Sequence, residues 1–135
     1  MKILFLIVTL GFLIAAKAPV TNDQAGTMPL VVSFASECCG VPSEAPLYTY
    51  IRSFRKKYKL RPVSFYKAGP LGREGEYKLG FPLKGFTRSQ KAEFIRNVTR
   101  ISKQKHDKGN MFTELNTTWN TADFPERATI KQIVL

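Results

Sequence analysis

Hydrophobic and polar residues alternate along several short stretches of the chain and recur at helical spacing along two others. Residues 28–35 form a dense apolar run, which is typical of a largely buried strand. Residues 63–65 and 77–83 alternate on either side of a glycine-rich turn and predict a hairpin. The alternating patterns of residues 111–119 and 129–135 predict a fourth and a fifth strand.

Two apolar stripes with helical spacing predict one helix after the first strand and another after the hairpin. Ser43 is a candidate N-cap for the first helix, whose stripe covers residues 47–58. Thr87 and Gln90 have the spacing of a capping box and indicate where the second helix begins. Gly109 is expected to end that helix, because glycine adopts the left-handed conformation found at helix C-termini.

The order of these elements predicts the fold. Strand, helix, hairpin, helix and strand is the βαββαβ order of the ferredoxin-like split βαβ fold. We therefore expect an α+β two-layer sandwich, with two helices on one face of an antiparallel sheet and an extra C-terminal strand. A chain of 135 residues is long enough for one core and too short for two.

The N-terminus has the features of an export signal. Lys2 precedes the apolar residues 3–16, and Ala16-Lys17-Ala18 has the small-x-small form that signal peptidases cleave. Fourteen helical residues span about 21 Å, which is less than the roughly 30 Å core of a bilayer. Pro19 hinders cleavage after Ala18, so an uncleaved anchor remains the alternative.

This signal divides the chain and predicts its location. Residues 1–18 are the signal, residues 19–27 a polar lead-in, and residues 28–135 a single basic domain. The protein is expected to be secreted or periplasmic, or tethered to a membrane through the uncleaved segment. Removal of the signal leaves nineteen basic and ten acidic residues, a net charge of +9.

Basic residues gather on the two predicted helices. Residues 52–61 contain six basic residues and no acid, and the second helix adds three basic residues on one face. The candidate surface for an anion or a partner consists of Arg52, Lys56, Lys57, Arg96, Arg100 and Lys103. Its expected partners are anionic lipid, polysaccharide or an acidic protein, since nucleic acid is less accessible outside the cytoplasm. A solvated helix face with no partner is the alternative.

Cys38 and Cys39 are the only cysteines, and they are adjacent. They lie in the turn before the first helix, where the helix dipole favours a thiolate. Small soft-metal carriers with the same element order have a Cys-x-x-Cys pair in this turn, and the similarity here is topological because the spacing differs. The pair could bind a soft metal such as Cu(I) with a third ligand from elsewhere, form a vicinal disulfide, or join another chain. The alternative is a small buried apolar residue with a neighbour of no special role.

Groups that suggest catalysis are sparse. His106 is the only histidine and has no acid or nucleophile at a set spacing. Arg73 and Glu74 form the charged centre of the glycine-rich turn and are a candidate contact surface. The sequence therefore predicts a non-catalytic exported binding domain. A soft-metal or thiol-redox protein is the alternative, and an enzyme has the least support.

Overall fold

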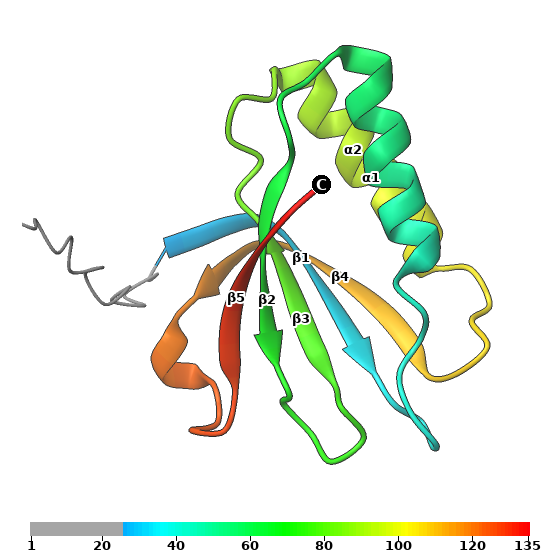
Figure 1. The fold of residues 1–135 in the computed structure, drawn as a ribbon, viewed down its shortest axis with the longest axis vertical. Coiled ribbons are helices and arrows are strands. Elements are labelled where there is room, and N and C mark those ends of the chain that lie inside the picture. Colours follow the sequence, from blue (N-terminus) through cyan, green and yellow to red (C-terminus); the bar gives the residue numbers. More distant parts are fainter. Residues whose placement is uncertain (1–25) are drawn as a thin grey trace, which may run out of the picture.

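The computed structural model describes residues 26–135, so the predicted signal and most of the lead-in lie outside the described residues. The chain forms five strands, two α-helices and one 3₁₀ turn (Figure 1). In chain order these are β1 (Gly26–Ala35), α1 (Ala45–Tyr58), β2 (Ser64–Gly69), β3 (Tyr77–Phe81), α2 (Arg88–Ser102), β4 (Asn110–Trp119), η1 (Thr121–Asp123) and β5 (Thr129–Val134).

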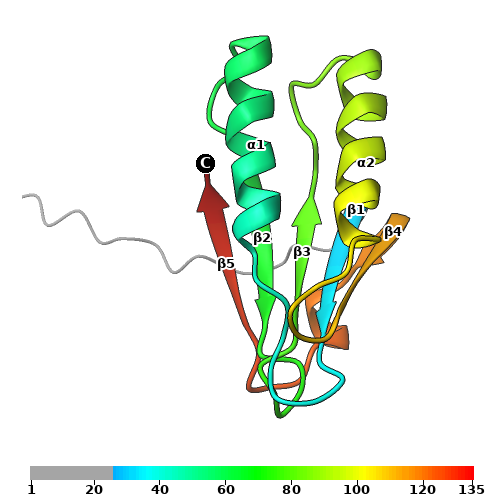
Figure 2. The same ribbon diagram turned by 90° about the vertical axis from the view of Figure 1, so that its right-hand side faces the viewer.

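The five strands form one antiparallel sheet in the order β4-β1-β3-β2-β5. Both helices pack on the same face of this sheet and lie antiparallel to each other (Figure 2). The α+β class, the βαββαβ order, the hairpin and the additional C-terminal strand are therefore confirmed. β1 begins at Gly26, two residues before the predicted start, because Gly26 and Thr27 pair with the end of β4.

The first helix begins where proline and the apolar stripe favour it. Pro46 occupies the first turn, where a missing amide hydrogen removes no helical bond. Glu44 is the N-cap, and the Ser43 hydroxyl accepts a hydrogen bond from the Ala45 amide at 3.2 Å, so the predicted cap lies one residue too early. The helix ends at Lys59, whose left-handed backbone lets its amide bond to carbonyls of the last turn.

The second helix begins as predicted and ends earlier than predicted. Thr87 and Gln90 form a complete capping box, in which each side chain accepts a hydrogen bond from the other residue's amide. The helix ends at Ser102 rather than near Gly109, so the prediction for Gly109 is wrong. Gly109 instead precedes β4 with a φ of +52°, and a side chain there would collide with the backbone of Ala35.

Two apolar clusters hold the layers together. The larger one lies between the sheet and the helices, where rings of Phe54, Phe81 and Phe94 are fully or almost fully buried. The smaller one lies on the opposite face, where Trp119 packs edge-on against Phe124 at 5.2 Å between ring centroids. The central strands of the sheet therefore bury apolar residues on both of their faces.

β3 lies between β1 and β2, so it is a central strand, and Pro82 marks its end. Gly80 in this strand lies directly beneath Trp119. A methyl group at Gly80 would lie 2.8 Å from the indole ring, which is shorter than carbon atoms tolerate. Gly80 is thus required for close approach of the indole to the sheet.

We expect Gly80→Ala to destabilise the domain by about 1–3 kcal/mol, because overpacking displaces Trp119 or the strand beneath it. Trp119 is the only tryptophan, so its fluorescence during denaturant unfolding reports both stability and the displacement. Gly26→Ala is the matched control, since within residues 26–135 no atom beyond the chain neighbours lies within 4 Å of a methyl group at Gly26. Equal losses of stability in the two variants would contradict this packing argument.

Candidate functional site

Positive charge is concentrated at one end of the molecule. Residues 52–63 and 82–97 contain ten basic residues and one acid, whereas the rest of residues 26–135 contains nine basic and eight acidic residues. The first segment is the C-terminal half of α1 with the connection to β2, and the second is the loop after β3 with the first two-thirds of α2. Because the helices are antiparallel, these segments lie side by side (Figure 2). We call them together the basic end.

Two adjoining hollows open on the basic end. A hollow of about 390 Å³ is lined by Arg52, Arg55, Lys56, Lys59 and Leu60. A groove of about 720 Å³ shares Lys59 and Leu60 with it and adds two further cations, Arg61 and Lys84. Among the described residues, no carboxylate side chain lines either one. An anion entering them would therefore meet cations without a competing internal partner.

The groove combines cations with apolar walls. Lys59, Arg61 and Lys84 are exposed, whereas Pro82 and Phe86 are partly buried and form part of the wall. Tight backbone turns place these groups. Lys59 and Leu83 have φ angles of +50° and +48°. This left-handed backbone conformation is uncommon for residues other than glycine. The cations thus lie next to apolar surface on turns that the fold constrains.

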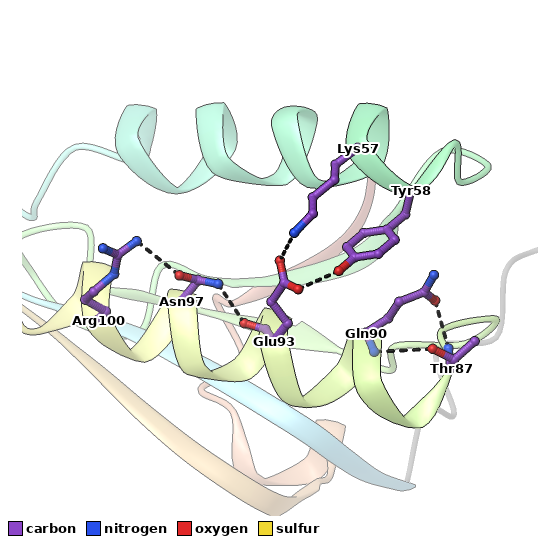
Figure 3. Close-up of polar contacts among 7 residues, drawn as sticks. All are labelled: Lys57, Tyr58, Thr87, Gln90, Glu93, Asn97 and Arg100. Atoms are coloured by element: carbon purple, nitrogen blue, oxygen red, sulfur yellow. Dashed lines mark hydrogen bonds and ion pairs between the residues drawn. The ribbon is translucent and has the colours of Figure 1, made fainter.

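Glu93, the one acid of the basic end, links the two helices (Figure 3). Lys57 donates to one carboxylate oxygen at 2.8 Å, and the Tyr58 hydroxyl donates to the other at 2.5 Å. The Lys57 ammonium, and secondly the Tyr58 hydroxyl, hold the pKa of Glu93 below its ordinary value. On the same helix, Asn97 donates to the Glu93 carbonyl oxygen, and Arg100 donates to Asn97.

The predicted surface residues fall into separate groups. Arg52 and Lys56 line the smaller hollow, and Lys57 is held in the ion pair with Glu93. Arg96, Arg100 and Lys103 are exposed along α2. Arg96 lies within the basic end, where its charge also acts on Glu93, whereas Arg100 and the C-cap residue Lys103 follow it towards the C-terminal end. The structure thus brings Arg52 and Lys56 together and separates them from Lys103.

The sequence-based choice of residues missed four cations of the hollows. Arg55, Lys59 and Arg61 belong to the acid-free residues 52–61, and that run was a signal for all three. Lys84 lies alone in a loop, and only the fold brings it to the groove.

The two thiols lie at the opposite end of the sheet, in the loop that follows β1. Cys38 and Cys39 are both exposed and form no disulfide, and the Cys39 thiol donates to the Cys38 sulfur at 3.1 Å. The hydrogen bond from Cys39 is the largest cause that raises the pKa of the Cys38 thiol. Desolvation and the negative charges of Glu37 and Glu74 act in the same direction. A thiolate favoured by the helix is therefore the wrong expectation for Cys38.

The predicted turn contact lies close to the thiols. Arg73 and Glu74 are exposed in the connection between β2 and β3, and the Glu74 amide donates to a carboxylate oxygen of Glu76 at 3.1 Å. The charge of Glu74 acts on Cys38, so the fold joins two features that are far apart in sequence. Within residues 26–135, no group of three or more His, Cys, Asp and Glu side chains is placed to hold a metal ion.

A further ionic cluster joins residues that no sequence pattern predicts to be neighbours. The Lys67 ammonium lies 2.6 Å from a carboxylate oxygen of Glu44 and 3.8 Å from the centre of the Tyr77 ring. Burial is the main cause that raises the pKa of the Tyr77 hydroxyl, so this phenol stays protonated. The cluster joins the start of α1 to β2.

Comparisons with known proteins identify no relative. No protein-family model matches the chain, and neither the curated proteins nor the solved structures provide a significant match. Over the part of the chain that the structure describes, no helix is both long and apolar enough to cross a bilayer. The function is therefore argued from the chemistry of the residues.

We expect Glu93→Gln to destabilise the domain at neutral pH, because it removes the carboxylate that pairs with Lys57 and Tyr58. A lowered pKa in the folded state means that this stabilisation is fully present above the unfolded value, about 4.3. It is lost as the pH falls through the folded pKa. Urea unfolding of both proteins from pH 7 to pH 3 should show a difference that disappears in acid. A difference that is constant over this range would refute the role of the carboxylate charge.

Proposed function

We propose that the protein is an exported, non-catalytic binding domain whose basic end holds an anionic partner. The observation that carries this proposal is the concentration of charge, ten basic residues against one acid in two adjacent segments. The single acid is already paired with Lys57, so it does not compete for the neighbouring hollows. Arg52, Lys56, Lys59, Arg61 and Lys84 are exposed there for an incoming ligand.

A surface with this charge pattern attracts polyanions over several ångströms. Summed charges of one sign raise the local concentration of the opposite sign and speed association. Salt screens exposed charges beyond about 8–10 Å at physiological ionic strength, so binding should weaken as salt is added. Anionic lipid, polysaccharide and an acidic protein are the partner classes that this mechanism accepts. Secretion or a periplasmic location is part of the proposal and rests on residues 1–18.

The strand order also supports a proposal about the fold family. We infer that β1 to β4 form a ferredoxin-like split βαβ unit, to which β5 is added along β2. The strand order β4-β1-β3-β2 and the two helices on one face support this assignment. Such a unit leaves the outer faces and the ends of both helices free to contact a partner.

Neutralising the groove should weaken binding to a model polyanion. We expect the triple variant Lys59→Gln, Arg61→Gln and Lys84→Gln to bind dextran sulfate about tenfold more weakly, since exposed pairs contribute about 0.2–1 kcal/mol each. The control triple variant, Lys105→Gln, Lys108→Gln and Lys131→Gln, changes net charge equally at exposed lysines outside the basic end. Equal losses in both variants, measured by titration calorimetry at 0.15 M salt, would show that net charge alone is responsible.

The thiol pair carries a second candidate function, binding of a soft monovalent ion such as Cu(I). The observation that favours it is geometric: both sulfurs are exposed and lie 3.1 Å apart, within reach of one ion. Thiolates are the ligands that Cu(I) prefers. Binding must release the thiol protons, and the raised pKa of Cys38 makes that release harder near neutral pH.

We therefore expect the affinity for Cu(I) to rise with pH between 6 and 9, because protons compete with the ion for Cys38 and Cys39. Competition with a chromogenic Cu(I) chelator measures this affinity. The double variant Cys38→Ser and Cys39→Ser should lose the binding and keep its affinity for dextran sulfate. Unchanged Cu(I) binding in the double variant would eliminate the second candidate and leave the first intact.

A further inference from the structure

We infer that the anionic partner of the basic end is a phospholipid, whose phosphate lies on the cations of the groove while its first acyl carbons contact the groove's apolar wall. This inference rests on the proposed function and names the partner class. Three features of the described residues support it: the composition of the groove, the arrangement of cations around it, and the position of the basic end relative to the start of β1.

The composition of the groove favours an amphiphilic ligand. Its volume of about 720 Å³ falls in the range of small-molecule sites, about 300–1,000 Å³. Lys59, Arg61 and Lys84 supply charge at its surface. Its accessible apolar and aromatic lining consists of the exposed Pro62 and the partly buried Leu60, Tyr66, Pro82 and Phe86, whereas Val63 and Leu83 belong to the buried core beneath it. A sulfated polysaccharide would use the cations and leave the accessible part of this apolar lining in water.

Further cations surround the groove and suit a surface that carries many phosphates. The smaller hollow shares Lys59 with the groove and adds Arg52, Arg55 and Lys56. Each Lys or Arg near an anionic membrane strengthens binding about fivefold. Several headgroups can therefore be bound at once, one in the groove and others around it.

The course of the chain places the basic end towards a membrane. β1 and β3 are antiparallel and pair Leu30 with Phe81, so β1 starts at the end of the sheet where β3 finishes and the groove opens. Residues 1–18 are expected to be an export signal or an anchor. Nine residues extend at most about 30 Å, so an anchor in residues 3–16 would keep Gly26, and the basic end with it, near the bilayer.

Exposed apolar residues indicate how deeply such a domain would insert. Three large apolar side chains are more than half exposed in the described part of the chain: Phe112, Leu115 and Val134. Val134 lies beside the groove, opposite Ser64, whereas Leu115 lies at the same level of the sheet but on the edge strand β4, opposite Leu30. Docking through the basic end would therefore be peripheral, driven by charge and by the groove rather than by a protruding apolar loop.

The first test compares two soluble ligands on the full chain by titration calorimetry. Dihexanoyl-phosphatidylglycerol, kept below its micelle concentration, carries the headgroup and short acyl chains, whereas glycerophosphoglycerol carries the headgroup alone. We expect the acylated ligand to bind at least tenfold more tightly, which corresponds to burial of about two methylene groups. Equal affinity would overturn the inference, because charge alone would then explain binding.

The second test uses sedimentation with vesicles of phosphatidylcholine, with and without 30% phosphatidylglycerol. The full chain should bind the anionic vesicles, release them at high salt, and lose about a hundredfold in affinity in the variant that lacks the charges of Lys59, Arg61 and Lys84. The control triple variant should bind as the unaltered protein does. Vesicle binding that is equal in all three proteins would refute docking through the groove.

Binding to dextran sulfate distinguishes a failure of the phospholipid inference from a failure of the proposed function. Strong binding to dextran sulfate without preference for anionic vesicles or for the acylated ligand would refute the lipid and retain the basic end as a polyanion site. Failure to bind dextran sulfate and vesicles alike would refute the proposed function itself. Binding to anionic vesicles and to the acylated ligand, with loss in the groove variant, supports both.

Discussion

The packing of Phe54 against Phe94 is the contact on which the rest of the structure depends. These rings come from α1 and α2, their centroids lie 5.2 Å apart, and both are almost fully buried above the sheet. Phe86 adds a second contact to each of them at 5.4 Å. Burial of each ring is worth about 1.5–3 kcal/mol. This contact holds the two antiparallel helices together on the sheet and thereby keeps the two basic segments adjacent.

The same contact holds like charges close to one another. Exposed pairs contribute only a few tenths of a kcal/mol each, and salt screens them. Burial of the aromatic rings therefore outweighs the repulsion, and one carboxylate, Glu93, is placed where it neutralises Lys57 at the helix interface. The helices can thus carry an excess of cations on their outer surface without losing their orientation. The charge pattern and the fold are compatible because apolar burial, rather than ion pairing, determines the helix contact.

The fold was largely predictable because its elements have strong periodicity. The dense apolar run of β1 and the capping box at Thr87 identify their elements without tertiary information. Boundaries were less predictable, and Gly109 shows why. A glycine after a helix suits a C-cap, yet here it is required because β4 passes close to the backbone of Ala35. Close approach between distant segments leaves no pattern in the local sequence.

The sequence predicted the chemistry of the candidate site better than the set of residues that form it. The acid-free residues 52–61 indicated a cationic surface, and Arg52 and Lys56 do line a hollow there. The register between the helices decides that Lys57 meets Glu93, and the path of the loop between β3 and α2 brings Lys84 to the groove. Helical periodicity alone contains neither piece of information. Cys38 illustrates the same limit, because its pKa responds to Cys39 and to Glu74, which belongs to a different loop.

The distribution of acids favours the proposed binding surface over an ordinary solvated helix face. Solubility requires net charge and does not require that charge to be gathered in one place. Outside the basic end, the described chain has nine basic and eight acidic residues, so it is close to balance by itself. Nearly all the net charge is therefore confined to two segments that the fold makes adjacent, where it lowers stability by repulsion. A local excess that opposes folding is better explained by a partner that neutralises it than by solvation, because solvation is served equally well by mixed charge.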